Sequence, residues 1–463
     1  MLCRNNFLSF SIKIFFSICF FALTTVHAVT AQETTFSGNL STLAGCGLPN
    51  THENKGDYLV GQTVFDSTIK SYIDESMLLV NSQVVYDALA GQSSNGTESL
   101  VSSDGSFALK LKEAYLDYNG GFWAVRAGRQ IAAWGKADEI QIADILCPQD
   151  NSVMIAANYK ESRLGIDALR LSLIGDNTQL DAYWIPFFTP STLPLAKGNP
   201  LNSIYFPKSY EGYAINSCPH SWEDLNLPEK KLYNSECAFR LSSYFSRLDI
   251  SFYGFYGWED TPFITYDPVF APNSNDISGI NMVTSYKRIL MFGTDAAIPC
   301  GNFVFRLETA FFPNRYIQTS ADYQENCISA NEDVEPAKKK HQLIGLIGFD
   351  WDVGGGWTLL AQYVGDSVSG DVKDLDRKRY EHQATVSITK TLLNDLLSLS
   401  LHGALDLCDY SSLIDAEAEY SLTDSITMSL IGNFYNEGPD NKQGMYGIYR
   451  DLSCITLKGK ISF

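Results

Sequence analysis

Long apolar runs, basic residues and cysteine–histidine clusters are all scarce in this sequence. After the first thirty residues, no apolar stretch reaches the roughly eighteen residues of a membrane-spanning helix. Acidic residues outnumber basic ones by 53 to 34, a net charge of −19, which argues against nucleic-acid partners. No CxxC pair or Cys/His cluster occurs, so we expect no metal site and no cofactor. A Pro/Ser-rich linker is also missing, which favours one large domain.

The N-terminal segment has the features of an export signal. Arg4 and Lys13 precede an apolar run from Ile14 to Leu23, and the small residues Ala28 and Ala31 suit cleavage. The uninterrupted apolar run is shorter than the ~20 residues that a membrane anchor needs. We therefore predict a signal peptide over residues 1–31 and a mature domain over residues 32–463.

The mature sequence consists largely of segments whose polarity alternates from one residue to the next. The last segment alternates in this way through Ile455, Thr456, Leu457, Lys458, Lys460, Ile461, Ser462 and Phe463. Segments 397–407 and 426–435 repeat the pattern. In a soluble sandwich the apolar face would be the core, whereas in a membrane barrel it contacts lipid and the polar face lines the lumen.

The lengths of the connections separate these two folds. Short turns such as Asp74-Glu75 and Ser246-Arg247 alternate with long irregular stretches such as 134–162 and 188–235. The long stretches all fall on one side of the predicted strands, which we call outward, and 408–411 is the one short connection on that side. This alternation is typical of outer-membrane barrels with short periplasmic turns and long extracellular loops. We predict an all-β, transmembrane antiparallel β-barrel of about sixteen to eighteen strands, surrounded by the lipids of the bacterial outer membrane.

A barrel of about this strand number leaves an aqueous lumen unless it is plugged. The strand phase places twelve charged or titratable residues on the polar faces, as pore-lining candidates: Arg126, Arg170, Arg240, Arg306, Glu308, His402, Asp406, Asp415, Glu417, Glu419, Lys458 and Lys460. Asp415, Glu417 and Glu419 share one strand. A basic wall opposite them would create a transverse field, and the alternative is that they are simply solvated.

The longest outward stretch, residues 188–235, is rich in proline and aromatic residues. Loops of more than about 12–15 residues usually have a function or are disordered. The aromatic content favours order, and we expect this stretch to form a constriction or a lid.

One stretch carries a recognisable motif, which consists of Gly128, Arg129, Gln130, Trp134, Gly135 and Asp138. It resembles the Gly-Arg-Gln…Trp-Gly motif of a large family of porin-like bacterial outer-membrane barrels. The resemblance implies a barrel without catalytic residues in the motif. We expect Arg129 and Asp138 to pair where the loop enters the barrel, and Trp134 to cap the rim of the lumen. The alternative is a motif needed only for folding.

The chain ends in Phe463. Barrels of this kind resemble one another in ending on an alternating strand with a terminal Phe or Trp. The resemblance implies that Phe463 is a signal read by the barrel assembly machinery.

These features predict a porin-like channel for passive diffusion of small hydrophilic solutes or ions, and not an enzyme. One alternative is a receptor or adhesin barrel without an open pore. Another is a lipid hydrolase, which would need a Ser and a His at neighbouring lipid-facing positions. Only His402 lies in mid-strand, and its phase is inward. The sequence leaves the oligomeric state open, and a homo-oligomer is compatible with it.

Ten cysteines include two in the signal segment, so eight remain in the mature chain. An even number in an exported protein suggests disulfides. Cys218 and Cys237 lie on one outward connection, and closing such a loop stabilises a fold by roughly 3 kcal/mol. Cys408 and Cys454 form a second candidate pair. Cys300 falls in a predicted periplasmic turn and is expected to lack a partner within the chain.

Overall fold

The computed structural model describes residues 33–48, 54–97, 99–154, 159, 161–210, 213–272, 277–330 and 332–463. The predicted signal peptide lies outside these residues. Eighteen antiparallel strands form a closed barrel, because each pairs with the next and the last pairs with the first, β23 with β1. The prediction of an all-β barrel is confirmed, at the upper end of the predicted range.

The barrel strands are β1 (Glu33–Gly47), β2 (Tyr58–Ile73), β3 (Ser76–Asp87), β5 (Phe107–Asn119), β6 (Trp123–Gln130), β7 (Ile166–Ile174), β8 (Thr178–Ile185), β11 (Glu236–Phe245), β12 (Leu248–Trp258), β15 (Arg288–Cys300), β16 (Phe303–Gln318), β17 (Ala337–Gly354), β18 (Trp357–Val368), β19 (Tyr380–Leu392), β20 (Leu397–Asp406), β21 (Ser412–Thr423), β22 (Ile426–Asn436) and β23 (Cys454–Ser462).

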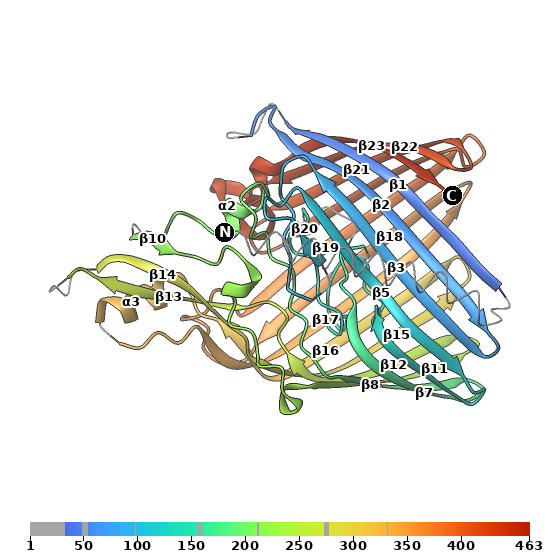
Figure 1. The fold of residues 1–463 in the computed structure, drawn as a ribbon, viewed down its shortest axis with the longest axis horizontal. Helices are drawn as coiled ribbons and strands as arrows, with labels where there is room; N and C mark the ends of the chain where they lie inside the picture. The colour runs from blue at the N-terminus through green and yellow to red at the C-terminus, as the bar shows by residue number, and fades with distance from the viewer. Residues whose placement is uncertain are drawn as a thin grey trace, which may run out of the picture.

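Short turns and long loops occupy opposite ends of the barrel. Turns such as Asp74-Glu75 and Ser246-Arg247 gather at the end that carries the C-terminus (Figure 1). The other end carries all the long loops, with α2 (Asn202–Tyr205), α3 (Ala321–Ala330) and α4 (Gly444–Gly447). By the rule for these barrels, the first end is periplasmic and the second extracellular.

Two small additions extend the extracellular end. β4 (Ser99–Val101) pairs with β5 beyond the end of β6. A separate sheet of β9 (Ser209–Tyr210), β10 (Tyr213–Ser217), β13 (Phe263–Phe270) and β14 (Ile277–Ser285) projects from the barrel (Figure 1). None of the helices in the described part of the chain is long and apolar enough to span a membrane.

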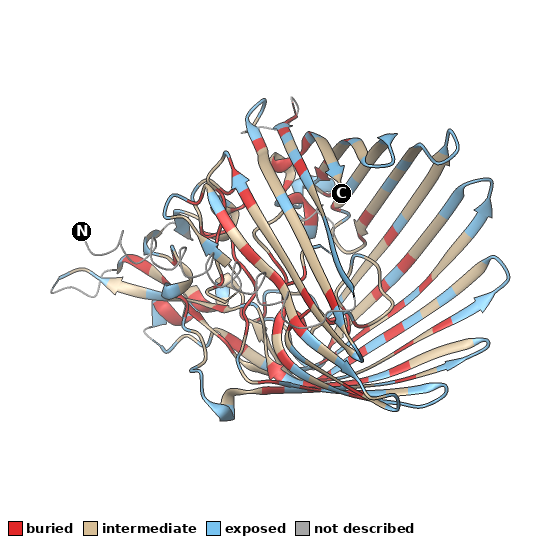
Figure 2. Cartoon of the chain, turned by 45° about the vertical axis from the view of Figure 1, so that its right-hand side comes forward, coloured by how far each residue is buried: buried red, intermediate tan, exposed pale blue. Residues whose placement is uncertain are grey.

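The strands alternate as the sequence predicted on their lipid-facing side. In β23, Ile455, Leu457 and Ile461 are exposed on the outer surface, and Thr456 is buried inside. The inner surface departs from the prediction of a polar lining. Inward residues such as Tyr253, Met291 and Phe312 are fully buried and belong to an apolar cluster with residues 132–147. Figure 2 shows buried segments distributed along the strands. The apolar core of the barrel therefore forms between these inward strand residues and the segment 132–147, which enters the barrel.

Candidate functional site: a lumen crossed by its own loop

The segment after β6 runs into the barrel and packs against its inner wall. Trp134 is buried, with its ring 4.9 Å from that of Tyr253 and 6.0 Å from that of Tyr183. Ile142, Ala143 and Leu146 continue the same apolar contact. The prediction that Trp134 caps the rim was wrong, because the apolar inner faces of β8 and β12 bury the indole inside. We call residues 131–147 the crossing loop.

Glu308 of β16 fixes the crossing loop through three backbone N–H groups. Its Oε2 accepts hydrogen bonds from Lys136 (2.5 Å) and Ala137 (2.8 Å), and its Oε1 accepts one from Ala143 (2.8 Å). Gly135 has φ +80°, and a Cβ there would lie 2.5 Å from Oε1 of Glu308. This close approach explains the glycine in the motif. Glu308 is 1% exposed, so it anchors the loop instead of lining open lumen as predicted.

The tip of the crossing loop reaches the far wall. Asp138 exchanges two hydrogen bonds of 3.0 Å with the side chain of Gln362 on β18, and its carboxylate pairs with Arg306. The carboxylate of Glu139 lies 2.9 Å from Nε2 of His402 on β20. Since β6 and β20 lie eight places apart by the shorter way around the ring of eighteen strands, the loop spans the lumen.

The motif residues at the end of β6 anchor the base of the crossing loop. Arg129 pairs with Asp167 at 2.7 Å and donates to the carbonyl of Thr97, and Gln130 donates to the carbonyl of Ala168. The predicted pair of Arg129 with Asp138 does not form, because the crossing loop carries Asp138 across the barrel to Arg306. Gly128 has φ +123°, where a Cβ would lie 2.3 Å from the carbonyl oxygen of Ala114.

A second clamp closes the crossing loop at its C-terminal side. Asp144 accepts a hydrogen bond from the backbone N–H of Trp134 at 3.0 Å and pairs with Arg163 at 2.5 Å. Cys147 is fully buried next to this clamp, and burial raises the pKa of its thiol to about 12. The loop is therefore held at its base, middle and tip by separate contacts.

Three arginines point into the lumen from one side of the barrel, and three carboxylates point into it from the other side. Arg126, Arg170 and Arg240 point inward from β6, β7 and β11, in register with the inward residues of their neighbours. Asp117 pairs with Arg126 and lies 3.9 Å from Arg170. The acidic residues Asp415, Glu417 and Glu419 point inward from β21, which lies nine places from β8 in the ring. We call the three arginines the basic wall, and the three carboxylates of β21 the acidic wall.

The remaining pore-lining candidates differ in their surroundings. Lys458 and Lys460 point inward from β23, in register with Ser429 and Thr427. Asp406 is 8% exposed and accepts a hydrogen bond from the backbone of Cys408, so it shapes the turn after β20. Arg306 forms ion pairs with Asp138 and Asp350, which balance its charge.

The loop at 188–235 covers the extracellular end of the barrel, which agrees with the predicted lid, and a constriction of the lumen by this loop stays a prediction. The hydroxyl of Ser191 donates to Asp260 at 3.0 Å, and the amide of Asn226 donates to the carbonyl of Thr284 at 2.9 Å. Burial raises the pKa of Asp260 to about 6. Leu201 of the same loop packs with Leu413 and Tyr435, so the loop contacts both other extracellular loops and the inner wall of β21 and β22.

The eight cysteines of the mature chain are free thiols, so the two predicted disulfides do not form in this structure. Cys237 lies exposed on the outer face of β11, whereas Cys218 directly follows β10 of the separate sheet. Cys454 is buried inside the barrel, with its Sγ 3.7 Å from Oδ1 of Asn433, and Cys408 contacts the carbonyl of Tyr380. Proximity along the chain did not bring Cys218 and Cys237 together, and a position two strands apart did not bring Cys408 and Cys454 together.

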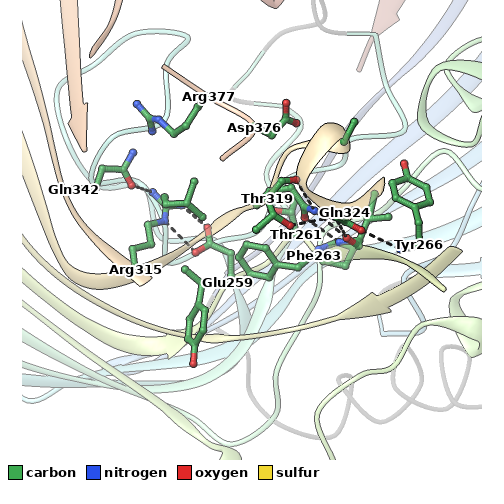
Figure 3. A pocket seen from close by; sticks show the side chains of 16 residues that line it. Glu259, Thr261, Phe263, Tyr266, Arg315, Thr319, Gln324, Gln342, Asp376 and Arg377 are labelled. Carbon is green, nitrogen blue, oxygen red and sulfur yellow. Dashed lines mark hydrogen bonds and ion pairs between the residues drawn. The ribbon is translucent and has the colours of Figure 1, made fainter. Parts of the chain in front are cut away.

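The extracellular mouth holds a cavity of about 530 Å³ between β13, β16, α3 and loop 369–379 (Figure 3). Phe263 and Tyr266 supply aromatic surface, and the buried Gln324 donates to the carbonyl of Ile264 at 3.1 Å. Asp376 also lines the cavity, and burial raises the pKa of its carboxyl. Amides, a carboxylate and rings of this kind contact polar organic solutes.

Sequence reasoning missed Glu139, Ser387 and Gln362. The side chain of Ser387 lies 2.8 Å from Nδ1 of His402, opposite the contact with Glu139. Ser387 and His402 are cross-strand partners on β19 and β20. Glu139 and Gln362 join the site only through the path of the crossing loop, for which the sequence has no periodic signal. In the described part of the chain, no group of three or more His, Cys, Asp or Glu residues could hold a metal ion.

Comparisons with known proteins agree with the barrel. A family model described as a protein of unknown function, DUF1302, matches residues 54–463. The crystal structure of Acinetobacter baumannii OccAB1 is similar with a TM-score of 0.52, at 9% identity over 94% of this chain and 97% of that one. That of Pseudomonas aeruginosa OccK2 (OpdF) in complex with glucuronate has a TM-score of 0.50, at 10% identity over 94% and 98%. No curated protein matches the sequence. The chain is a barrel of the bacterial outer membrane, and the similarity concerns the fold alone.

Proposed function

The chain belongs to the DUF1302 family, and on that premise we propose that it is a porin-like channel for passive diffusion of small hydrophilic solutes or ions. The observation that carries this proposal is the crossing loop, which narrows a lumen of eighteen strands and reaches His402 on the far wall. Selectivity in such channels resides in inward side chains and infolded loops. Outer-membrane lipids surround the barrel, and the assembly machinery inserts it.

The opposed charged walls support a role in ion passage. Arg170 and Arg240 point inward from one side, and Glu417 and Glu419 from the other. A solute that passes between them experiences a transverse field. Like charges on one wall are tolerated when they face water and mobile counter-ions.

The contacts of His402 support a channel over a hydrolase. Ser387, His402 and Glu139 form a chain of contacts at 2.8 and 2.9 Å, which has the connectivity of a catalytic triad. Catalysis would also need N–H donors for the developing oxyanion. Ser387 lies in mid-strand, and β19 pairs with β18 and β20 around it, so backbone N–H groups there are engaged in the sheet. The side chains also face the lumen and not lipid.

Replacing Glu417 and Glu419 with glutamine lowers the permeability of cations relative to anions, because it removes the acidic wall while keeping side-chain size. Replacing Arg170 and Arg240 with glutamine shifts the same ratio the other way. The reversal potential of the purified protein in planar bilayers, across a KCl gradient, measures both effects.

The double variant Glu332→Gln, Asp333→Asn is the matched control, because it removes two acids from an exposed extracellular segment before β17. It should leave the reversal potential unchanged. Equal shifts for the control and the acidic-wall variant, or shifts of the same sign for both walls, would contradict the proposed selectivity.

A further inference from the structure

Three basic side chains gather on the outer surface of the barrel at its extracellular rim. Lys287 and Arg288 lie at the start of β15, and Lys339 lies near the start of β17. Arg288 shares the lipid-facing side of β15 with Phe292, which is 49% exposed. Lys339 shares the lipid-facing side of β17 with Leu343, which is 50% exposed. The group therefore sits where the apolar band ends.

Aromatic rings hold these three cations in place. The guanidinium carbon of Arg288 lies 4.3 Å from the ring centroid of Trp258 and 5.1 Å from that of Tyr256. The Nζ atoms of Lys287 and Lys339 lie 5.6 and 5.0 Å from the ring of Tyr316. Trp and Tyr are typical of membrane interfaces, and cation–π contacts orient charges there. Together these residues line a depression of about 270 Å³, which we call the rim site.

The charges of the rim site are not neutralised. Within the described residues, none of the three cations forms an ion pair with a carboxylate, whereas Arg306, Arg315 and Arg377 all do. Arg288 instead donates to the backbone carbonyls of Tyr233 (2.8 Å) and Ser235 (3.1 Å). Three unpaired cations in one place are unusual for a chain with a net charge of −19. They point to an anionic ligand outside the barrel.

We propose that the rim site binds the phosphate-bearing headgroup of a lipid in the outer leaflet. Phosphate oxygens accept hydrogen bonds from guanidinium and ammonium groups, and basic residues at a membrane surface attract anionic headgroups. The aromatic rings lie beside the cations and offer an apolar surface to the part of the lipid next to its headgroup. The inference depends on the fold and its orientation, and not on whether the lumen conducts.

The opposite rim offers a matched control. Nζ of Lys390 lies 5.0 Å from the ring of Trp357, also on the lipid-facing side, but next to the turn between β17 and β18 at the periplasmic end. It donates to the carbonyl of Gly355 at 2.6 Å. Lys390 thus repeats the cation–aromatic contact as a single charge in the other leaflet.

The test measures binding of a phosphorylated glycolipid, bis-phosphorylated lipid A, to the full-length barrel in detergent by native mass spectrometry. The double variant Lys287→Gln, Lys339→Gln should bind it about tenfold or more weakly than the wild type. Lys390→Gln should bind it as the wild type does. Arg288 is left in place because it also supports the loop at 233–235, and heat-modifiable mobility verifies that each variant is folded.

Two further arms separate the possible sources of phosphate. Dephosphorylated lipid A should bind no better to the wild type than to the double variant. Inorganic phosphate at equal concentration should not displace the intact glycolipid. Unchanged binding by the double variant, or equal binding of the dephosphorylated lipid, would overturn the proposal. Displacement by inorganic phosphate would mean that the site takes a free anion and not a lipid.

Discussion

Replacing Glu308 with alanine raises the conductance of the channel several-fold. The carboxylate holds three backbone N–H groups of the crossing loop. Hydrogen bonds to a charged group stabilise a fold by about 1.5–3 kcal/mol each, so losing all three costs the closed loop position at least about 4.5 kcal/mol. A change of that size shifts the loop equilibrium by roughly a thousandfold or more. Single-channel recording measures the conductance, and proteolysis within residues 131–147 measures release of the loop.

Glu236→Gln is the control for this experiment. Glu236 is also a buried, inward carboxylate, but its hydrogen bond goes to the backbone N–H of Trp258 at 2.8 Å, and not to the crossing loop. This variant should keep the wild-type conductance. If Glu308→Ala folded normally and conducted like the wild type, the crossing loop would not be what narrows the lumen.

Removing residues 459–463 abolishes insertion into the outer membrane without affecting export. Phe463 closes the barrel seam, since it exchanges backbone hydrogen bonds of 2.9 and 3.0 Å with Gly38 of β1. Its ring lies 5.7 Å from that of Phe36 and 6.0 Å from that of Phe65, across the same seam. The truncated chain should collect in the periplasm, which fractionation and heat-modifiable mobility would detect.

Phe303→Ala separates this role from a general need for aromatic side chains. Phe303 stacks on Trp351 at 5.2 Å near the periplasmic end, away from the seam. The Phe303→Ala variant should assemble normally, and the Phe463→Ala variant should assemble less efficiently. Normal mobility and surface exposure of the truncated chain would contradict a role of the last strand in assembly.

The barrel could be predicted because the polarity of each strand's residues depends on whether they face lipid or the interior. Residues such as Leu457 and Lys458 alternate with the period of a strand, and the turns between hairpins are short enough to recognise. Strand count, closure and the sides of the connections follow from these local signals. The inner face was predicted less well, since Met291 and Phe312 occupy inward positions that a water-filled lumen would make polar.

The site could be predicted only in part, because it depends on where one loop goes. The inward phase of Arg170, Arg240, Glu417 and Glu419 followed from strand register. The pairing of Asp138 with Arg306, and of Glu139 with His402, connects residues more than 160 positions apart through a segment without periodicity. Proline and aromatic content indicated only the loop at 188–235, which packs at the extracellular end of the barrel.

The single-channel conductance of the purified full-length protein in planar bilayers tests the central claim most directly. If the crossing loop narrows but does not seal the lumen, insertion events produce discrete, ion-passing current steps. A folded, heat-modifiable barrel that inserts without any current step would contradict the channel and would favour a sealed receptor or adhesin.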